Sequence, residues 1–167
     1  MDAVKRHTIA VLVDNEPGVL ARVIGLFSGR GYNIESLTVS ETEHEAHVSR
    51  ITIVTAGTDD VIEQIKHQLE RLVPVHKVTD LTVQGEALER ELALVKVVGK
   101  GDQRVEALRL AAAFGARTLD ATLTSFVFEF TGTTEEVERF LRIMSDVGLA
   151  EVARTGIAAM SRGTEPA

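Results

Sequence analysis

The segment Asn15-Glu16-Pro17-Gly18 is the part of the sequence best suited to hold a small ligand. An apolar, strand-like run at residues 8–13 comes before it, and apolar residues at helical spacing begin at Val19. The start of a helix offers unpaired backbone N–H groups and the positive end of the helix dipole, so a carboxylate finds donors there. The Asn15 carboxamide can donate and accept, and Gly18 lets a ligand approach the backbone. A free amino acid is one molecule that suits such a site.

A purely structural interpretation of the same residues stays open. Asn15 belongs to a residue type that commonly caps helices, and Gly18 would then only relieve the turn. Asn33 has two similar interpretations, because an amide at the start of a strand is more often a turn residue than a ligand contact. Spacing alone does not decide between a ligand site and a cap.

Other polar groups give weaker indications of chemistry. Residues 43–47 (Glu-His-Glu-Ala-His) crowd imidazoles and carboxylates together as a metal site would, but a charged hairpin loop is usually only solvated. His7, His67 and His76 are scattered, and we expect them at the surface. Gly99-Lys100-Gly101 completes neither the dinucleotide fingerprint nor a P-loop, so we interpret it as a turn. We assign no metal ligands and no catalytic residues.

The composition excludes several classes of protein. The 167 residues include no cysteine, which excludes disulfides and thiolate catalysis and fits a reducing compartment. A formal net charge of -7 repels phosphate backbones, and the chain has no Trp and one Tyr to stack on bases, so we predict no nucleic-acid binding. Residues 1–8 are charged and have no long apolar stretch behind them. We therefore predict no signal peptide, no membrane span and a cytoplasmic protein.

The apolar periodicities predict one order of elements that occurs twice: strand, helix, strand, strand, helix, strand. A polar segment, residues 84–90, separates the two copies as a linker. The second helix of each copy opens with Gly-Thr, at residues 57–58 and 132–133, which lie 75 residues apart. The predicted strands are residues 8–13, 32–40, 47–55, 75–83, 92–98, 117–120, 126–130 and 149–160, and the predicted helices start near residues 19, 58, 101 and 133.

This order predicts an α+β protein of two ferredoxin-like βαββαβ units, each an antiparallel sheet with two helices on one face. The other face of each sheet would stay open. In one strand Ile51 and Ile53 would face the helices while Arg50 and Thr52 point away, although Val54 breaks the alternation. Open faces and open sheet edges favour dimerisation or a partner chain.

Phe126, Phe128 and Phe130 give the clearest period-two pattern in the sequence. Three rings on one strand face could form a ligand wall or a platform for stacking bases. Core packing is the more common role of such residues, and we predict that role here.

Several longer segments match a known family. They are residues 15–20 (NEPGVL), the most specific, with 22–27 (RVIGLF), 30–39 (RGYNIESLTV), 49–53 (SRITI), 90–96 (RELALVK) and 151–156 (EVARTG). Together they resemble the acetolactate synthase (acetohydroxyacid synthase) small subunits, and the resemblance runs through nearly the whole chain.

The resemblance implies that residues 1–84 form an ACT domain, which binds an effector, typically valine, at a homodimer interface. It implies that residues 85–167 form a second ferredoxin-like domain that contacts a catalytic subunit. The second unit lacks an Asn-x-x-Gly at its corresponding turn, so we expect no effector there. The effector-binding residues carried over are Asn15, Gly18, Val19 and Leu20 from one protomer and Asn33 and Ile34 from the other.

The function that the resemblance implies is that of a non-catalytic regulatory subunit. It would activate the large catalytic subunit of acetolactate synthase and confer feedback inhibition by valine or another branched-chain amino acid. Thiamine diphosphate, Mg2+ and FAD would belong to that other polypeptide, and we assign no cofactor to this chain. Two alternatives stay open: an amino-acid sensor that controls transcription, for which no helix-turn-helix or basic patch is visible, and a small enzyme on the same scaffold.

Overall fold

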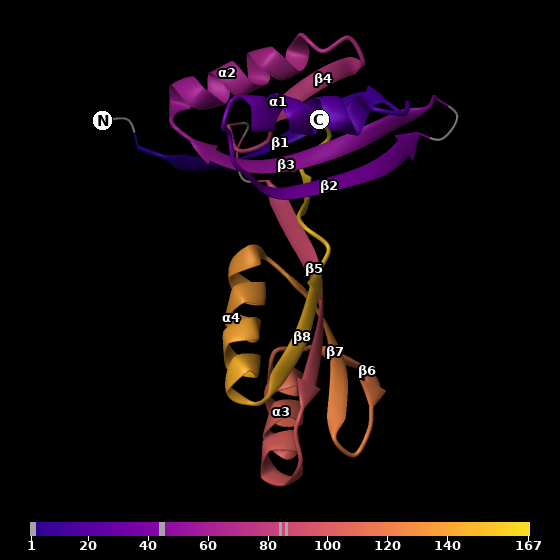
Figure 1. Ribbon diagram of the computed structural model, residues 1–167, viewed down its shortest axis with the longest axis vertical. Helices are drawn as coiled ribbons and strands as arrows, with labels where there is room; N and C mark the ends of the chain where they lie inside the picture. The colour runs from indigo at the N-terminus through magenta and orange to yellow at the C-terminus, as the bar shows by residue number, and fades with distance from the viewer. Residues whose placement is uncertain (1–2, 44–45, 84, 86) are drawn as a thin grey trace. The chain divides into compact units, whose positions relative to one another are not determined.

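The computed structural model describes residues 3–43, 46–83, 85 and 87–167, and it divides the chain into two compact units (Figure 1). Residues 1–88 and 157–167 form the first unit, and residues 89–156 form the second. The sheet of the first unit has the strand order β2-β3-β1-β4, and that of the second has the corresponding order β6-β7-β5-β8. The predicted repeat of two βαββαβ units is confirmed.

The first unit packs two helices on one face of its antiparallel sheet (Figure 1). Alternate residues of β1 and β3, including Ile9 and Ile53, are fully buried against the helices. Thr58 caps α2, because its side chain accepts a hydrogen bond from the Val61 N–H. The elements are β1 (Lys5–Asp14), α1 (Val19–Gly29), β2 (Ile34–Glu43), β3 (Val48–Gly57), α2 (Asp59–Glu70) and β4 (Val75–Asp80).

The second unit repeats this arrangement with a larger aromatic core. Phe126, Phe128 and Phe130 are buried between the sheet and the helices, so the prediction that they pack in the core is confirmed. Thr133 and Glu136 form the capping box that their spacing indicates, at the start of α4. The elements are β5 (Leu88–Val98), α3 (Gly101–Ala113), β6 (Arg117–Ala121), β7 (Ser125–Gly132), α4 (Thr134–Asp146) and β8 (Leu149–Arg154).

The end of the chain differs from the prediction. The strand expected over residues 149–160 is two strands, β8 and a short β9 (Ala158–Met160). Residues 157–167 belong to the first unit, so a second domain of residues 85–167 is wrong for these last residues. The physical reason is that Ile157 and Ala159 are buried with Val54 and its neighbours on the sheet face away from the helices. This contact also explains why Val54 is apolar, and it corrects the expectation of a fully open face.

Candidate functional site

The loop between β1 and α1 places Asn15 and Gly18 at an exposed turn. Gly18 is the residue that precedes the first turn of α1, and its φ of 86° lies in the left-handed region that glycine adopts without strain. No side chain caps this helix. The Asn15 backbone N–H donates a 2.7 Å hydrogen bond to the His47 carbonyl. The interpretation of Asn15 as the cap of α1 is therefore wrong.

The first turn of α1 retains backbone donors. The Val19 N–H donates a long, 3.4 Å hydrogen bond to the Glu16 carbonyl. The Arg22 N–H donates a 3.1 Å hydrogen bond to the Gly18 carbonyl. Within the described residues, the N–H groups of Leu20 and Ala21 have no protein acceptor. By contrast, threonine hydroxyls accept from the first turns of α2 and α4, while α3, like α1, has no side-chain cap. The start of α1 therefore combines unpaired donors with the positive end of the helix dipole, which suits a carboxylate.

The remaining predicted residues lie at the start of β2. Asn33 is exposed, and its backbone carbonyl accepts a 2.6 Å hydrogen bond from the hydroxyl of the buried Thr55. Ile34 is half-buried and packs against the core under the helices. The pairing of β2 with β3 shifts register between Ile34 and Ser36, which is the signature of a β-bulge.

The two groups of predicted residues lie at opposite ends of the sheet within one chain. Asn15 follows Asp14, which pairs with Val48 at the first residue of β3. Ile34 pairs with Thr55, near the last residue of β3. These two positions of β3 are seven residues apart, which corresponds to roughly 23 Å along an extended strand. The structure therefore brings Asn15, Gly18, Val19 and Leu20 together and separates them from Asn33 and Ile34.

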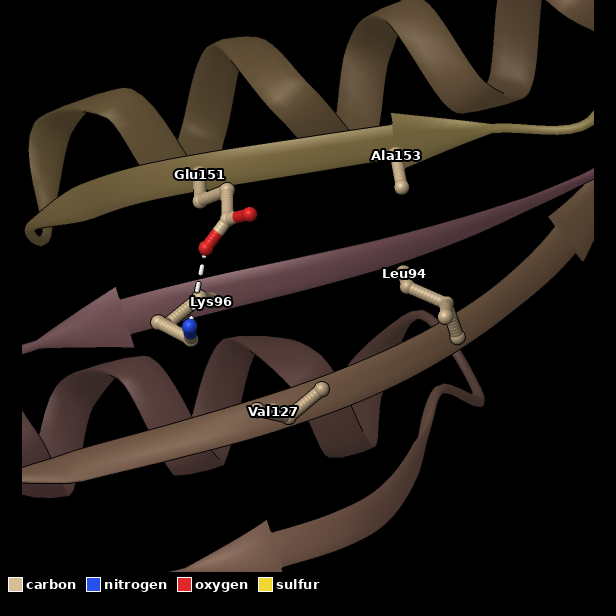
Figure 2. A pocket seen from close by; sticks show the side chains of 5 residues that line it. All are labelled: Leu94, Lys96, Val127, Glu151 and Ala153. Atoms are coloured by element: carbon tan, nitrogen blue, oxygen red, sulfur yellow. Dashed lines mark hydrogen bonds and ion pairs between the residues drawn. The ribbon is translucent and has the colours of Figure 1, made fainter.

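The second unit carries a shallow hollow of about 190 Å³ on the sheet face away from its helices. Figure 2 shows the side chains that line it, which come from the neighbouring strands β5, β7 and β8. The Lys96 ammonium donates a 2.8 Å hydrogen bond to the Glu151 carboxylate, and this bond raises the pKa of Lys96 and lowers the pKa of Glu151. Leu94, Val127 and Ala153 supply the apolar part of the lining.

The histidines do not form a metal-binding group in the described part of the chain. His67 and His76 are exposed as expected. His7 is buried, and its Nδ1 lies 2.8 Å from Asp80 Oδ2, so the prediction of a surface position was wrong for this residue. In the cluster of residues 43–47, His44 and Glu45 lie outside the described residues. No three His, Cys, Asp or Glu side chains that the structure describes are placed to hold a metal ion.

Gly99-Lys100-Gly101 forms the turn that leads into α3, as predicted. Among the described helices, none combines the length and the apolar composition that crossing a membrane requires.

Two features of the chain are typical of regulatory, ligand-binding proteins: its repeated fold and the open start of α1. Two βαββαβ units follow one another, and the first carries an exposed strand-to-helix loop with free backbone donors. A family model described as the AHAS small subunit-like ACT domain matches residues 9–77. A second model, described as the small subunit of acetolactate synthase, matches residues 90–163. The first unit is thus of the ACT class.

Relatives of known name agree along nearly the full length. A protein of Archaeoglobus fulgidus named "Probable acetolactate synthase small subunit" is 48% identical over 160 residues, which cover 96% of this chain and 99% of that protein. The acetolactate synthase isozyme 3 small subunit of Salmonella typhimurium is 45% identical over 159 residues, which cover 95% of this chain and 96% of that protein. The crystal structure of the small subunit from Thermotoga maritima aligns with a TM-score of 0.87 at 38% identity, over 96% of this chain and 99% of that one. The chain belongs to the acetolactate synthase small-subunit family.

Proposed function

We propose that this protein is a regulatory subunit that activates the catalytic subunit of acetolactate synthase and confers feedback inhibition by valine or another branched-chain amino acid. Membership of the small-subunit family supports the choice of partner. The observation that carries the effector site is the first turn of α1, where the N–H groups of Leu20 and Ala21 have no acceptor among the described residues. A free amino acid carries the carboxylate that such donors favour.

The proposed effector site is completed by a second copy of the chain. β2 is an edge strand, so one side of its backbone is available for pairing. It runs in the same direction as β1, because both are antiparallel to β3. Antiparallel pairing of β2 with β2 of a second copy would therefore bring the start of the partner's β2 to the end of the sheet that carries Asn15. This geometry supports a homodimer in which each site takes the helix start from one protomer and Asn33 and Ile34 from the other.

In this site the effector carboxylate would accept hydrogen bonds from the first turn of α1. The carboxamides of Asn15 and Asn33 would orient the molecule, and the exposed Leu20 and the half-buried Ile34 would contact its branched side chain. Val19 is 5% exposed and packs in the core under the helices, so it would support the start of α1 rather than contact the effector. One methylene in such an apolar site is worth only about 1–3 kcal/mol, so leucine and isoleucine should also bind.

The chain itself is proposed to be non-catalytic and cytoplasmic. The condensation of pyruvate, with thiamine diphosphate, Mg2+ and FAD, is assigned to the catalytic subunit. The second unit is proposed to contact that subunit. Its helix start at Gly101 follows Lys100 rather than an Asn-x-x-Gly turn, which supports a role other than effector binding.

The test is acetolactate formation by the cognate catalytic subunit with and without this protein, across a titration of valine. We expect the wild-type protein to raise activity and to make it sensitive to valine. Asn15→Ala should keep the activation and lose most of the sensitivity, whereas Gln68→Ala, which removes a carboxamide from α2, should behave as wild type. A catalytic subunit that binds this protein and shows no change in activity would overturn the proposal.

A further inference from the structure

Residues 157–167, here called the C-terminal segment, cover part of the first unit's sheet on the face away from α1 and α2. Ile157 is 4% exposed and Ala159 is 8% exposed. They pack with Ala10, Val54 and Leu81 in a small core that is separate from the one under the helices. The segment is therefore held by burial as well as by its covalent connection.

Side-chain hydrogen bonds attach the C-terminal segment to three strands of the first unit. Ser36 of β2 accepts a 2.9 Å hydrogen bond from the Ile157 N–H, and Arg50 of β3 donates a 2.6 Å bond to the Ala159 carbonyl. Lys77 of β4 donates to the Pro166 carbonyl at 3.3 Å. Burial lowers the pKa of Arg50, so its guanidinium is partly desolvated where it holds the segment. The bond from Arg50 to the Ala159 carbonyl is therefore short, charge-assisted and partly buried, and it determines where the segment docks on β3.

The β-bulge in β2 connects this attachment to the proposed effector site. In a regular strand residues two apart lie on the same face. Ile34 packs against the core under the helices, while Ser36 pairs with Val54 and meets Ile157 on the opposite face. The bulge between them thus directs Ile34 toward one face and Ser36 toward the other. Ile34 and Ser36 are thus the two residues that flank the bulge, one on each face of the sheet.

The C-terminal segment is also tied closely to the second unit along the chain. The Thr155 N–H donates to the Leu92 carbonyl at 3.0 Å, and the Thr155 hydroxyl accepts from the Leu92 N–H at 3.1 Å. Both residues belong to the second unit. Ile157, the first residue of the segment, follows only two residues later. The segment that docks on Ser36 thus begins directly after the last residues of the second unit in the sequence.

We propose that the C-terminal segment is a regulatory element whose docking on β2 and β3 is coupled to effector binding, an inference that rests on the proposed function. Effector bound at Ile34 orders the start of β2 and fixes Ser36, which favours the docked segment. The docked segment in turn orders β2 and favours the effector, because coupling between two sites is reciprocal. Ser36 and Arg50 are then positioning residues that act on the site without contact with the effector.

The experiment compares two charge substitutions that lie three residues apart. Ile157→Asp places a carboxylate in the buried contact, and Met160→Asp places the same charge at a side chain that is 63% exposed. Each full-length variant is combined with the catalytic subunit, and acetolactate formation is measured across a valine titration. Hydrogen exchange of the Ile157 amide, which donates to Ser36, is measured on the wild-type protein with and without valine.

The expected result is that Ile157→Asp keeps the activation but needs about tenfold more valine for half-inhibition, which corresponds to about 1.4 kcal/mol of coupling. Met160→Asp should match the wild type, and valine should slow the exchange of the Ile157 amide. Ser36→Ala should shift the valine response in the same direction by a smaller factor.

The outcomes separate this inference from the proposed function. Valine inhibition of equal potency in the wild type and in Ile157→Asp, with exchange of the Ile157 amide unaffected by valine, overturns the role of the C-terminal segment and leaves the proposed function intact. A wild-type complex that responds to none of valine, leucine and isoleucine overturns the effector part of the proposed function. That result also overturns the coupling between effector binding and docking of the C-terminal segment.

Discussion

The buried hydroxyl of Thr55 donates a 2.6 Å hydrogen bond to the backbone carbonyl of Asn33. Thr55 lies on β3 and is 0% exposed, whereas Asn33 is exposed and precedes the first residue of β2. Because Asn33 lies outside the strand, the regular ladder does not hold its backbone, and the threonine side chain takes that role. An inner strand thereby fixes one half of the proposed effector site.

Thr55→Val replaces the hydroxyl with a methyl group of similar size and leaves the Asn33 carbonyl without its partner. We expect the free energy of unfolding to fall by about 1–3 kcal/mol and the valine concentration for half-inhibition to rise several-fold. Urea unfolding and a valine titration of the reconstituted complex measure the two effects. Thr42→Val is the matched control, because the exposed Thr42 hydroxyl lies 3.5 Å from the Val48 carbonyl. We expect this variant to change neither the free energy of unfolding nor the valine response. An unchanged valine response in Thr55→Val would remove this residue from the site.

Gly18→Ala and Gly25→Ala make the same substitution just before α1 and inside it, and we expect opposite effects on stability. A Cβ would meet nothing within 4 Å at either position, so only backbone conformation differs. Gly18 has a φ of 86°, where an L-residue costs about 1–2 kcal/mol, whereas Gly25 lies inside α1, where alanine gains about 0.5–1 kcal/mol. Chemical denaturation measures both, and only Gly18→Ala should weaken valine inhibition. Equal shifts of the same sign would contradict the strain argument.

The sequence predicted the fold well because local signals agreed with the tertiary structure. The Gly-Thr openings, the capping residues and the alternation at Phe126, Phe128 and Phe130 are short-range patterns, and all appear in the structure. The loop at Asn15 and Gly18 was predictable for the same reason, because glycine and a strand-to-helix break mark it directly.

The features that sequence reasoning missed all depend on contacts between distant residues. Thr55 on β3 reaches Asn33 at the start of the neighbouring strand β2, and Ile157 meets Ser36 over 121 positions of sequence. The one available signal was Val54, whose apolar side chain broke the expected alternation because the C-terminal segment covers it. His7 was placed at the surface because its partner Asp80 lies 73 positions away and no periodicity links them.

Arg154→Ala tests the buried ion pair of the second unit. Glu91 has a side chain that is 3% exposed, and it accepts a 2.6 Å hydrogen bond from Arg154 and a 3.2 Å bond from the Thr134 hydroxyl. Removal of the guanidinium leaves a buried carboxylate without its counter-charge, so we expect a loss of about 3 kcal/mol in the free energy of unfolding. Glu138→Gln, which breaks only the exposed contact of the same arginine, should cost less than about 1 kcal/mol. Urea unfolding followed by circular dichroism measures the free energy of unfolding of both variants. Equal losses in the two variants would contradict the claim that the buried contact of Arg154 stabilises the fold more than its exposed contact.

Lys96→Met tests the electrostatics of the hollow in the second unit. The hydrogen bond from Lys96 lowers the pKa of the Glu151 carboxyl in the folded state, so the pair stabilises the fold above the unfolded-state pKa of that carboxyl. This stabilisation is lost as the pH falls through the folded-state pKa. In Lys96→Met we expect the pKa of Glu151 to rise toward its ordinary value, as measured by NMR titration of the carboxyl carbon. Lys100→Met, on the turn before α3, should leave that titration unchanged; a Glu151 pKa that stays low without Lys96 would refute the assignment of its cause.

Val39→Arg tests the homodimer on which the proposed effector site depends. Val39 lies on the edge strand β2 and is 45% exposed, and pairing of two β2 strands would bring the two copies of this residue near one another. Two like charges in such an interface repel, so we expect the variant to elute as a monomer in size-exclusion chromatography with light scattering, and we expect the wild type to elute as a dimer. Valine binding, measured by calorimetry, should be lost with the dimer, because the helix start and the partner subunit's Ile34 would no longer meet.

Val83→Arg is the control for this prediction. It places the same charge at a side chain that is 70% exposed outside β2, so the variant should remain dimeric and bind valine. A monomeric Val39→Arg variant that still binds valine as the wild type does would mean that one chain holds the whole site.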